Sequence, residues 1–333
     1  MNVQQPLVEI ILPFNKIDQY LLAAVKSVLA SKDVRTQILL LDDRVDTSAN
    51  LPELPIETCR FLRTSRRGYG NALSEGIHHL SSEFFALMNA DDVIHPRKLI
   101  TQILDLESRS ADLSVGKIVK FNNSGKIITQ SLGHLPTGQY TPSVLLLGAY
   151  GADASWCGRT DKVKSWKISN ELASDWITAL ENFSDLKIVY SSKALYFYRQ
   201  HHTQMTNTYD YKNFSFDEIY KSWNFLNLRQ GYRSVPKDVA KLVAAPWTVS
   251  EQSNLDSIKN ASAWLREFNL STHKRYAVLV NRRYAYLFFL AFKNHLLLIQ
   301  DLIPATFGVI NYCLETYLNV FRKILLRKFL QTR

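Results

Sequence analysis

The chain has 333 residues, and its composition, 46% hydrophobic and 21% charged, excludes a largely disordered protein. Its three cysteines lie far apart, without the spacing of a metal site or a disulfide framework, so we expect a reducing compartment. The formal net charge is +10, and residues 271–333 hold ten Lys or Arg against two Asp or Glu, which predicts an anionic partner for that segment.

Over the first hundred residues, short apolar runs typical of buried strands alternate with stretches that have the spacing of amphipathic helices. We expect strands at residues 8–12, 37–41 and 84–88. We expect helices at residues 18–30, 70–80 and 96–107. Unbroken apolar strands separated by helices predict an α/β fold, with a mostly parallel central sheet and helices on both faces. Ligands of such sheets bind beyond the carboxyl ends of the strands.

The pattern is less regular from residue 112 to 150, and it is followed by a predicted helix at 171–183 and strands at 186–190 and 194–198. Beyond residue 208 only helical segments are expected, so we predict a first domain at 1–208 and a helical, basic region at 209–333. The first residues lack a basic stretch followed by an apolar one, and no run of about 18 uncharged apolar residues occurs. Neither a signal peptide nor a transmembrane helix is therefore expected.

Two pairs of adjacent carboxylates follow predicted strands, Asp42 with Asp43 and Asp91 with Asp92. Both pairs should face one crevice, because the carboxyl ends of parallel strands meet at one edge. Adjacent carboxylates suit a hard divalent cation, but Asp91 and Asp92 could equally cap the helix that begins near Pro96. Asp42 and Asp43 could bind a nucleobase or a ribose, or cap a turn.

Three further stretches carry candidate chemistry. The loop from Arg66 to Gly70 opens a helix with two glycines, which suits an anion but also an ordinary flexible loop. Asp175 begins a helical pattern and is either a general base or a first-turn acid, with Glu171 as its competitor. Arg199 and His201 follow a strand, where they could reach a diphosphate or a metal, or be surface polar residues.

The order of these stretches resembles the inverting GT-A glycosyltransferases of family 2, of the bacterial polysaccharide type, over the first two hundred residues. Six motifs occur in the family's order: Val8–Asn15, Leu41–Asp43, Arg67–Ile77, Leu87–Asp92 with Pro96, Ser174–Trp176 and Tyr198–His201. The resemblance implies the GT-A nucleotide-sugar-binding fold. It also implies a nucleotide-sugar donor, with UDP as the expected nucleotide, and a single displacement with inversion at the anomeric carbon.

The resemblance also assigns roles to residues. The donor-binding residues that it implies are Pro13, Phe14, Asn15, Asp42, Asp43, Arg66, Gly70, Asn89, Arg199 and His201. Asp91, with Asp92 as a supporting acid, would hold Mn²⁺ or Mg²⁺ on the diphosphate, and Asp175 would take the proton of the acceptor hydroxyl.

The chain departs from the family pattern at several positions. Asn89 stands where the first aspartate of a D-x-D motif is usual, which removes one carboxylate from the expected metal site. Arg44 and Val45 replace the usual Gly-Ser, and Leu73 and Ser74 stand where Arg and Asn are frequent. These departures concern the identity of the donor more than the fold.

The stretches 284–292 and 311–330 mix aromatic, aliphatic and basic residues, a pattern that suits an anionic membrane surface or a helical bundle packed on the catalytic domain. Nucleic acid is not expected, because the bases are interleaved with large aliphatic residues. The sequence thus favours a metal-dependent hexosyl- or N-acetylhexosaminyltransferase, peripheral on the cytoplasmic face of the plasma membrane. Its acceptor would be a hydroxyl of a glycan or a lipid-linked acceptor, in O-antigen or capsule-type polysaccharide synthesis.

Two alternatives come from other functional classes. Asn89 keeps open a catalytically silent, glycosyltransferase-like scaffold that binds membrane or a partner through its C-terminal helices, although Asp91 and Asp175 argue against it. A nucleotidyltransferase would have similar sheet and metal chemistry. Residues Pro13–Lys16 lack the glycine-rich, basic loop that such an enzyme usually shows after its first strand.

Overall fold

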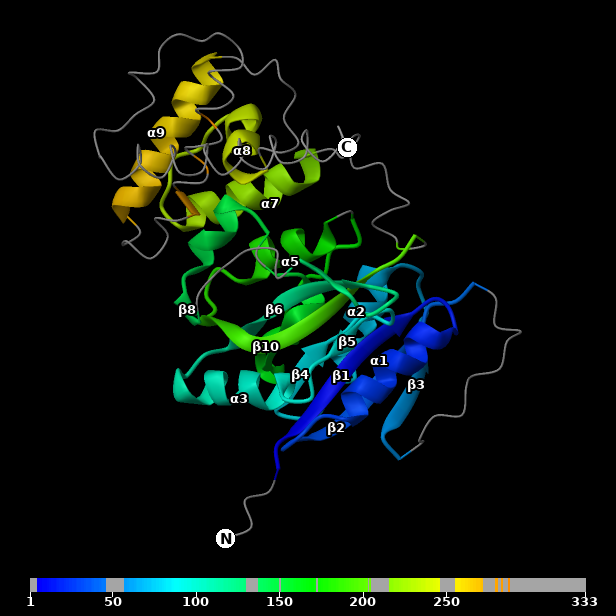
Figure 1. The fold of residues 1–333 in the computed structure, drawn as a ribbon. Coiled ribbons are helices and arrows are strands. Elements are labelled where there is room, and N and C mark those ends of the chain that lie inside the picture. The colour runs from blue at the N-terminus through cyan, green and yellow to red at the C-terminus, as the bar shows by residue number, and fades with distance from the viewer. Residues whose placement is uncertain are drawn as a thin grey trace, which may run out of the picture. The chain divides into compact units, whose positions relative to one another are not determined.

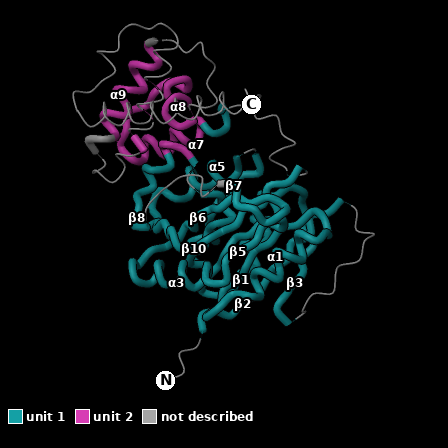
Figure 2. The backbone as a smooth tube through the Cα atoms, viewed as in Figure 1, with its two compact units in different colours: residues 1–145, 149–219 teal, residues 146–148, 220–333 magenta. Residues whose placement is uncertain are grey.

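The chain is described here from a computed structural model, which covers residues 5–45, 57–129, 137–149, 151–171, 173–202, 204, 216–245, 255–271, 279–280, 283 and 287. It divides into two compact units, coloured separately in Figure 2. Unit 1 comprises residues 1–145 and 149–219, and unit 2 comprises residues 146–148 and 220–333. The expected boundary after residue 208 lies in a stretch outside the described residues.

Unit 1 is built on one mixed sheet, to which ten strands belong within the described residues (Figure 1). The strands are β1 (Leu7–Phe14), β2 (Arg35–Asp42), β3 (Cys59–Arg63), β4 (Phe84–Leu87), β5 (Val93–Ile94), β6 (Leu113–Asn122), β7 (Ile127–Thr129), β8 (Gly138–Tyr140), β9 (Trp156–Arg159) and β10 (Ile188–Gln200). Their order is β3-β2-β1-β4-β9-β6-β10-β5, with β7 on β6 and β8 on β10. The pairs among β3, β2, β1 and β4 are parallel, as is β6 with β10, whereas β9 runs antiparallel to both β4 and β6.

Helices cover both faces of this sheet, as the sequence predicted. The elements are α1 (Gln19–Leu29), α2 (Tyr69–His78), α3 (Lys98–Ser108), α4 (Thr160–Val163) and α5 (Ser174–Asn182), with 3-10 turns η1 (Pro142–Leu147) and η2 (Asp153–Ser155). Apolar residues of α1 and α3 share one core cluster with alternate residues of β1 and β2. Helix α2 lies on the opposite face, where Gly76 is so close to Ile11 and Leu41 that an added Cβ would contact both.

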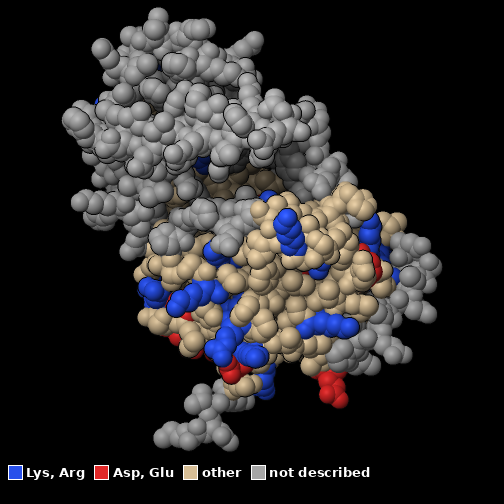
Figure 3. Space-filling model, in the orientation of Figure 1, with Lys and Arg blue, Asp and Glu red and all other residues tan. Residues whose placement is uncertain are grey.

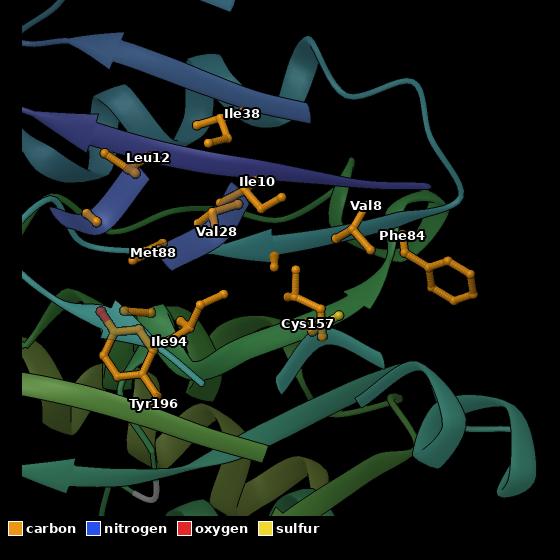
Figure 4. Close-up of a cluster of buried hydrophobic side chains, with 14 of the residues drawn as sticks. Val8, Ile10, Leu12, Val28, Ile38, Phe84, Met88, Ile94, Cys157 and Tyr196 are labelled. Atoms are coloured by element: carbon orange, nitrogen blue, oxygen red, sulfur yellow. The ribbon is translucent and has the colours of Figure 1, made fainter. Parts of the chain in front are cut away.

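The core cluster explains why these apolar runs fold as they do. Ile10 and Leu12 of β1, Val28 of α1 and Ile38 of β2 are at most 1% exposed. Figure 4 shows part of the cluster, with Ile10 beside Val28. Burying such a side chain contributes about 1.5–3 kcal/mol relative to leaving it in water. The cluster therefore fixes the strands whose ends carry the candidate site.

The long central strand β6 was not recognised in the sequence, where residues 112–150 were expected to be irregular. Lys117 and Lys120 interrupt its apolar pattern. Lys120 is accommodated because its ammonium lies 5.5 Å from the centre of the Tyr198 ring on the neighbouring strand β10. The two strands expected at 186–190 and 194–198 are one strand, β10, whose pairing with β6 is irregular between Ser191 and Leu195.

Unit 2 is helical within the residues described, with α7 (Phe216–Arg229) leading into it, followed by α8 (Lys237–Ala244) and α9 (Leu255–Ser271). Its core contains Trp223 and Trp264, whose ring centres lie 5.6 Å apart. Both indole N–H groups are satisfied, by Leu146 O at 2.9 Å and by Asn227 Oδ1 at 3.1 Å, respectively. None of the described helices is both long enough and apolar enough to cross a membrane.

The basic stretches expected at a membrane, 284–292 and 311–330, lie outside the described residues apart from Leu287. On unit 1, Figure 3 shows Lys and Arg side chains spread over the visible face, with neutral surface between them. The excess of positive charge lies mainly in the last fifth of the sequence, where residues 271–333 hold ten Lys or Arg against two Asp or Glu.

Candidate active site

The candidate site lies in unit 1 at the edge where β2, β1 and β4 end. The three strands are parallel, so their carboxyl ends meet there. Asp42 is the last residue of β2 and is paired with Phe14, the last residue of β1. Asn89 follows β4 closely, and the backbone N–H of Asp43 donates to Phe14 O at 2.9 Å. The expectation that both carboxylate pairs follow strand ends at one edge is confirmed.

Asp42 is committed to its own loop. Arg44 donates two hydrogen bonds to the Asp42 carboxylate, from Nε to Oδ1 at 2.8 Å and from Nη2 to Oδ2 at 2.9 Å. Arg63 Nη1 donates a third, to Asp42 Oδ2 at 3.1 Å. The Arg44 hydrogen bond is the main cause that lowers the pKa of Asp42 below its ordinary value. The Arg44 guanidinium also lies 5.8 Å from the centre of the buried Phe14 ring. Arg44, one of the departures from the family pattern, thus organises the strand end.

Pro13, Phe14 and Asn15 do not share one environment. Pro13 and Phe14 are buried within β1, whereas Asn15, just beyond the strand, is exposed. Of these three predicted donor-binding residues, only Asn15 is exposed to solvent.

Asp43 is linked to the glycine loop before α2. Its carboxylate accepts from Gly68 N at 3.2 Å and from Thr64 Oγ1 at 3.1 Å, and Arg67 Nη1 lies 4.0 Å from its Oδ1. Gly68 has φ +108, in the left-handed region that favours glycine. Asp43 and the loop are therefore brought together as the sequence predicted, while Arg66 is exposed at the loop's surface.

Gly70 has a packing reason to be glycine. A Cβ at this position would lie 2.1 Å from the carbonyl oxygen of Ser169, and the Gly70 N–H donates to Asn170 Oδ1 at 3.1 Å. The first turn of α2 therefore presses directly on the segment that leads to Asp175. Helix and segment cannot move independently without breaking this contact.

Asp91 lies against the end of β10. Its Oδ2 is 3.1 Å from His201 Nε2, and the His201 ring centre is 4.9 Å from that of Tyr20 in α1. Arg199 donates from Nε to Asp91 O at 2.9 Å, and its guanidinium lies 4.9 Å from the Tyr20 ring centre and 4.6 Å from that of Phe121. Arg199 and His201, which the sequence analysis considered together, form one cluster with Asp91.

Asp92 is enclosed. It is 0% exposed and accepts from Tyr196 Oη at 2.5 Å, Arg199 N at 2.7 Å and Asn89 Nδ2 at 3.2 Å. Burial raises the pKa of Asp92 well above its ordinary value, and the charge of Asp91 adds to the rise. Asp92 therefore ties the strand end to β10, and its partners already occupy both of its oxygens.

Tyr69 joins the strand end to Asp175. Its hydroxyl donates to Asn89 Oδ1 at 3.1 Å. Burial raises the pKa of Tyr69 well above its ordinary value, and the charge of Asp153, a buried residue of η2, adds to the rise. Burial raises the pKa of Asp153 to about 7, and the nearby Asp175 carboxylate adds to the rise. Burial also raises the pKa of Asp175, which lies in the first turn of α5 and accepts from Trp176 N at 2.8 Å. Asp175 and Asp153 are thus neighbouring acids.

Sequence reasoning missed four residues that shape this site: Tyr20, Tyr69, Asp153 and Tyr196. Tyr69 lies inside the glycine loop that was recognised, but the other three have no local motif that marks them. The others gain their roles from long-range contacts, such as the Tyr196 bond to Asp92 across 104 positions of the chain.

Metal-binding groups are sparse in the described part of the chain, where no cluster of three or more His, Cys, Asp or Glu side chains is placed to hold an ion. Asp91, the residue predicted to hold a metal ion, has the His201 imidazole as its neighbour, with Oδ2 3.1 Å from Nε2.

Comparison with known proteins gives a family model that matches part of the chain, partial relatives and a similar fold. Residues 10–165 match Glycosyl transferase family 2. An uncharacterized glycosyltransferase of Rickettsia felis (strain ATCC VR-1525 / URRWXCal2) is 26% identical over 106 residues, which are 31% of this chain and 18% of that protein. One of Rickettsia prowazekii (strain Madrid E) is 30% identical over 104 residues, 31% of this chain and 32% of that protein. The aligned region thus spans less than a third of the length of these relatives.

Among solved structures, S. aureus TarS 1–349 in complex with UDP-GlcNAc resembles this chain with a TM-score of 0.53 and 14% identity, over 89% of each chain. A second crystal structure of S. aureus TarS 1–349 gives a TM-score of 0.50 and 15% identity, over 89% of this chain and 88% of that chain. At such low identity the likeness shows the fold, an α/β GT-A-like architecture followed by helices.

Proposed function

Because residues 10–165 belong to glycosyl transferase family 2, we propose that this glycosyltransferase takes its sugar from a nucleotide-diphosphate sugar and transfers it with inversion to an acceptor hydroxyl. The observation that supports the proposal is the convergence of Asp43, the Asp91–His201 pair and Asp175 on one sheet edge, around Tyr69 and Asn89. UDP is the expected nucleotide, in keeping with the UDP-GlcNAc complex of TarS.

The donor would span this edge from the nucleobase end to the diphosphate end. At the first end, Asp43 holds the glycine loop through Gly68 N, and the half-buried carboxylate can accept from a base or a ribose. At the other end, Arg199 and His201 supply positive charge or N–H donors beside Asp91. Acceptor groups at one end of the edge and basic groups at the other match a ligand that has a polar, neutral base and an anionic diphosphate.

The residues present fit a divalent cation of the Mn²⁺ or Mg²⁺ class. A carboxylate oxygen of Asp91 and an imidazole nitrogen of His201 lie 3.1 Å apart, and a carboxylate oxygen is a ligand that suits Mg²⁺ and Mn²⁺. Such ions commonly take only one or two protein carboxylates and complete their shell with substrate phosphates and water. When bound, the ion would neutralise charge on the leaving diphosphate.

Asp175 is the residue that we assign to proton removal. Burial raises the pKa of Asp175 above its ordinary value, which makes the carboxylate a stronger base, while its place in the first turn of α5 favours the ionised form. In the reaction, the Asp175 carboxylate accepts the proton of the acceptor hydroxyl. The hydroxyl oxygen forms the new glycosidic bond to the anomeric carbon, and the bond from that carbon to the diphosphate breaks with its electron pair leaving on the nucleotide.

The acceptor is proposed to be a hydroxyl of a glycan or lipid-linked molecule, in cell-surface polysaccharide synthesis at the inner face of the plasma membrane. The support is the charge of residues 271–333, with ten Lys or Arg against two acids interleaved with aromatic and aliphatic residues. Sedimentation of the full chain with vesicles containing phosphatidylglycerol tests this part. Equal sedimentation with phosphatidylcholine vesicles and with anionic ones would reject it.

The transfer reaction is tested with purified full-length protein and a panel of UDP sugars that begins with UDP-GlcNAc, with UDP release measured in the presence of Mn²⁺, Mg²⁺ or EDTA. We expect release from at least one donor with a metal ion, and a loss of about 10²-fold or more in Asp175→Asn, the range typical for removal of a general base. The matched control is Asp161→Asn, which removes an acid of α4 whose side chain is 70% exposed and should leave the rate unchanged. Donor binding without any turnover would instead favour the silent scaffold.

A further inference from the structure

A short segment, residues 167–170, joins the glycine loop to helix α5, and we call it the clamp segment. On the loop side, Asn170 Oδ1 accepts from Gly70 N at 3.1 Å. An added Cβ at Gly68 would lie 2.5 Å from the same Asn170 oxygen. An added Cβ at Gly70 would lie 2.1 Å from Ser169 O. The backbone of the glycine loop therefore packs directly on the clamp segment.

On its other side, the clamp segment is bonded to α5 itself. Ser169 N donates to Thr178 Oγ1, in the middle of the helix, at 3.0 Å. Lys167 exchanges two hydrogen bonds with Asn182, the last residue of α5, from Lys167 N to Oδ1 and from Nδ2 to Lys167 O, at 2.8 Å each. The segment is thus fixed to the helix at two points. A movement of the segment therefore carries α5, and with it Asp175 in the first turn.

The entry into α5 is held in an unfavourable backbone conformation. Ala173, the residue before the helix, has φ +60, in the left-handed region, where a residue other than glycine costs about 1–2 kcal/mol. Its carbonyl oxygen accepts from Ile177 N at 3.0 Å and so begins the helix. Such a conformation persists only where surrounding contacts hold it. The clamp segment supplies contacts of this kind, so the placement of Asp175 depends on that segment.

The glycine loop also belongs to the nucleotide end of the proposed donor site. Gly68 N donates to the carboxylate of Asp43, the predicted base-binding residue, at 3.2 Å. Gly68 therefore contacts Asp43 through its N–H while its Cα faces the Asn170 amide. Its φ of +108 favours glycine, and so does the lack of room for a Cβ. A nucleotide that fixes Asp43 thus fixes the loop that bears on Asn170.

We propose that Asn170 is a positioning residue that couples occupancy of the nucleotide end to the placement of Asp175. A nucleotide at Asp43 steadies the glycine loop, the loop holds Asn170, and the clamp segment holds α5. The part of Asp175 as the base rests on the proposed transfer reaction, whereas the link between loop and helix does not. Asn170 is exposed, so its side chain can be replaced without leaving a cavity in the core.

Three substitutions separate this coupling from general effects on the fold. Asn170→Ala removes the acceptor for Gly70 N and the contact with Gly68. Asn170→Asp keeps an oxygen in that place and adds negative charge near the N-terminus of α2, which the helix dipole favours. Lys167→Ala is the matched control in the same segment, because Lys167 is exposed and bonds Asn182 through its backbone.

The first test needs no turnover. Amide hydrogen exchange of the full-length protein is followed by mass spectrometry in peptides from the glycine loop and from residues 166–178, with and without UDP and Mn²⁺. Without ligand, we expect exchange in residues 166–178 to be about fivefold faster in Asn170→Ala, the factor that corresponds to the loss of one hydrogen bond. With UDP, both regions should be protected in the wild type, in Asn170→Asp and in Lys167→Ala. In Asn170→Ala, only the glycine loop should be protected.

Two outcomes of this experiment overturn the inference. One is equal exchange of residues 166–178 in the wild type and in Asn170→Ala without ligand. The other is equal protection of those residues by UDP in both proteins. If calorimetry shows that UDP does not bind the wild type, the proposed function fails and the coupling to a nucleotide fails with it. Faster exchange in ligand-free Asn170→Ala would then still establish the link between the loop and the helix.

The second test separates positioning from binding, with UDP release from UDP-GlcNAc as the readout. In Asn170→Ala we expect kcat to fall by about 10- to 100-fold, because a misplaced base loses part of its contribution to the rate. KM should change by less than about threefold, since Asp43 and the diphosphate end stay in place. Asn170→Asp should recover most of kcat, and Lys167→Ala should match the wild type. A raised KM with an unchanged kcat in Asn170→Ala, or no recovery in Asn170→Asp, contradicts the positioning role.

Discussion

The Arg44–Asp42 pair offers the sharpest test of how the donor edge is held. Both side chains are almost fully buried, and Arg44 donates twice to the Asp42 carboxylate, at 2.8 and 2.9 Å. Arg44→Met keeps most of the volume and removes both bonds. Asp42 then retains one bond from Arg63 and one from the backbone N–H of residue 44, at 3.1 Å each.

Removing one partner of a buried ion pair costs about 3–5 kcal/mol, because the other charge remains buried. The two remaining hydrogen bonds to Asp42 offset part of this loss, so we expect Arg44→Met to lower the free energy of unfolding by about 2–3 kcal/mol at pH 7. Asp42→Asn combined with Arg44→Met removes the unpaired charge, and the double variant should regain most of the stability. The exposed Arg66 provides the control, since Arg66→Met should change stability by less than about 0.5 kcal/mol.

The pH dependence has a definite sign. The pKa of Asp42 is lowered in the folded chain, so the ion pair contributes stability above the ordinary pKa of 3.8 and loses it as the pH falls through the folded value. Urea unfolding followed by tryptophan fluorescence at pH 7 and at pH 3 measures both effects. Equal midpoints for wild type and Arg44→Met at pH 7, or a double variant as unstable as Arg44→Met, would refute this account of the pair.

Three further predictions concern neighbouring parts of the site. Gly70→Ala should lower both the thermal unfolding midpoint and the rate of UDP-GlcNAc turnover, because the added Cβ would lie 2.1 Å from Ser169 O. An unchanged midpoint in calorimetry would mean that the Ser169 segment moves aside without a loss of stability. The pKa of Asp153 is raised in the folded chain, so the wild type loses free energy of unfolding as the pH rises from 3.8 to about 7. Asp153→Asn lacks this loss, and its free energy of unfolding relative to wild type should therefore increase over that range, by at most about 4 kcal/mol. If urea unfolding gives the same difference in free energy between Asp153→Asn and wild type at every pH, this prediction is wrong. Arg199→Lys should lower the free energy of unfolding by about 1–2 kcal/mol, because a lysine cannot stack on the Tyr20 ring while it donates to the Asp91 carbonyl oxygen. An unchanged free energy in urea unfolding would contradict the importance of the stacking.

Much of the architecture was predictable because its signals are local. The expected strand at 84–88 and helix at 18–30 are β4 and α1, displaced at their ends by only a residue or so, since buried apolar runs and helical spacing are read directly from neighbouring residues. The carboxylate pairs could be placed at one edge for the same reason, because parallel topology follows from alternating strands and helices.

The missed features have a common physical cause. Lys117 and Lys120 obscured β6, although the stem of Lys120 packs and its ammonium lies over an aromatic ring of the neighbouring strand. Asp153 lies in the short turn η2, which has no pattern of its own, and its environment is made by Tyr69 and Asp175, far away in sequence. Such roles depend on which distant groups meet, and no local spacing records that.

The site residues predicted from the sequence divide into those that face the edge and those that support it. Asp43, Asp91, Asp175 and His201 stay candidates for direct contact with substrate. Asp42 and Asp92 are held by protein groups from several sides, so they act on the site through the backbone that they fix. For Asp91 and Asp92 this division agrees with the roles that the resemblance implied, whereas Asp42 and Asp43 look alike in the sequence and could not be divided there.

The central claim is that a nucleotide sugar binds along the edge from Asp43 to the Asp91–His201 pair. Isothermal titration calorimetry of the full chain with UDP-GlcNAc in the presence of Mn²⁺ tests it most directly, with Asp43→Ala, Asp91→Asn and the exposed-acid control Asp161→Asn. The account predicts binding that weakens tenfold or more in the first two variants and is unchanged in the control. Binding of equal strength in all four proteins would contradict it.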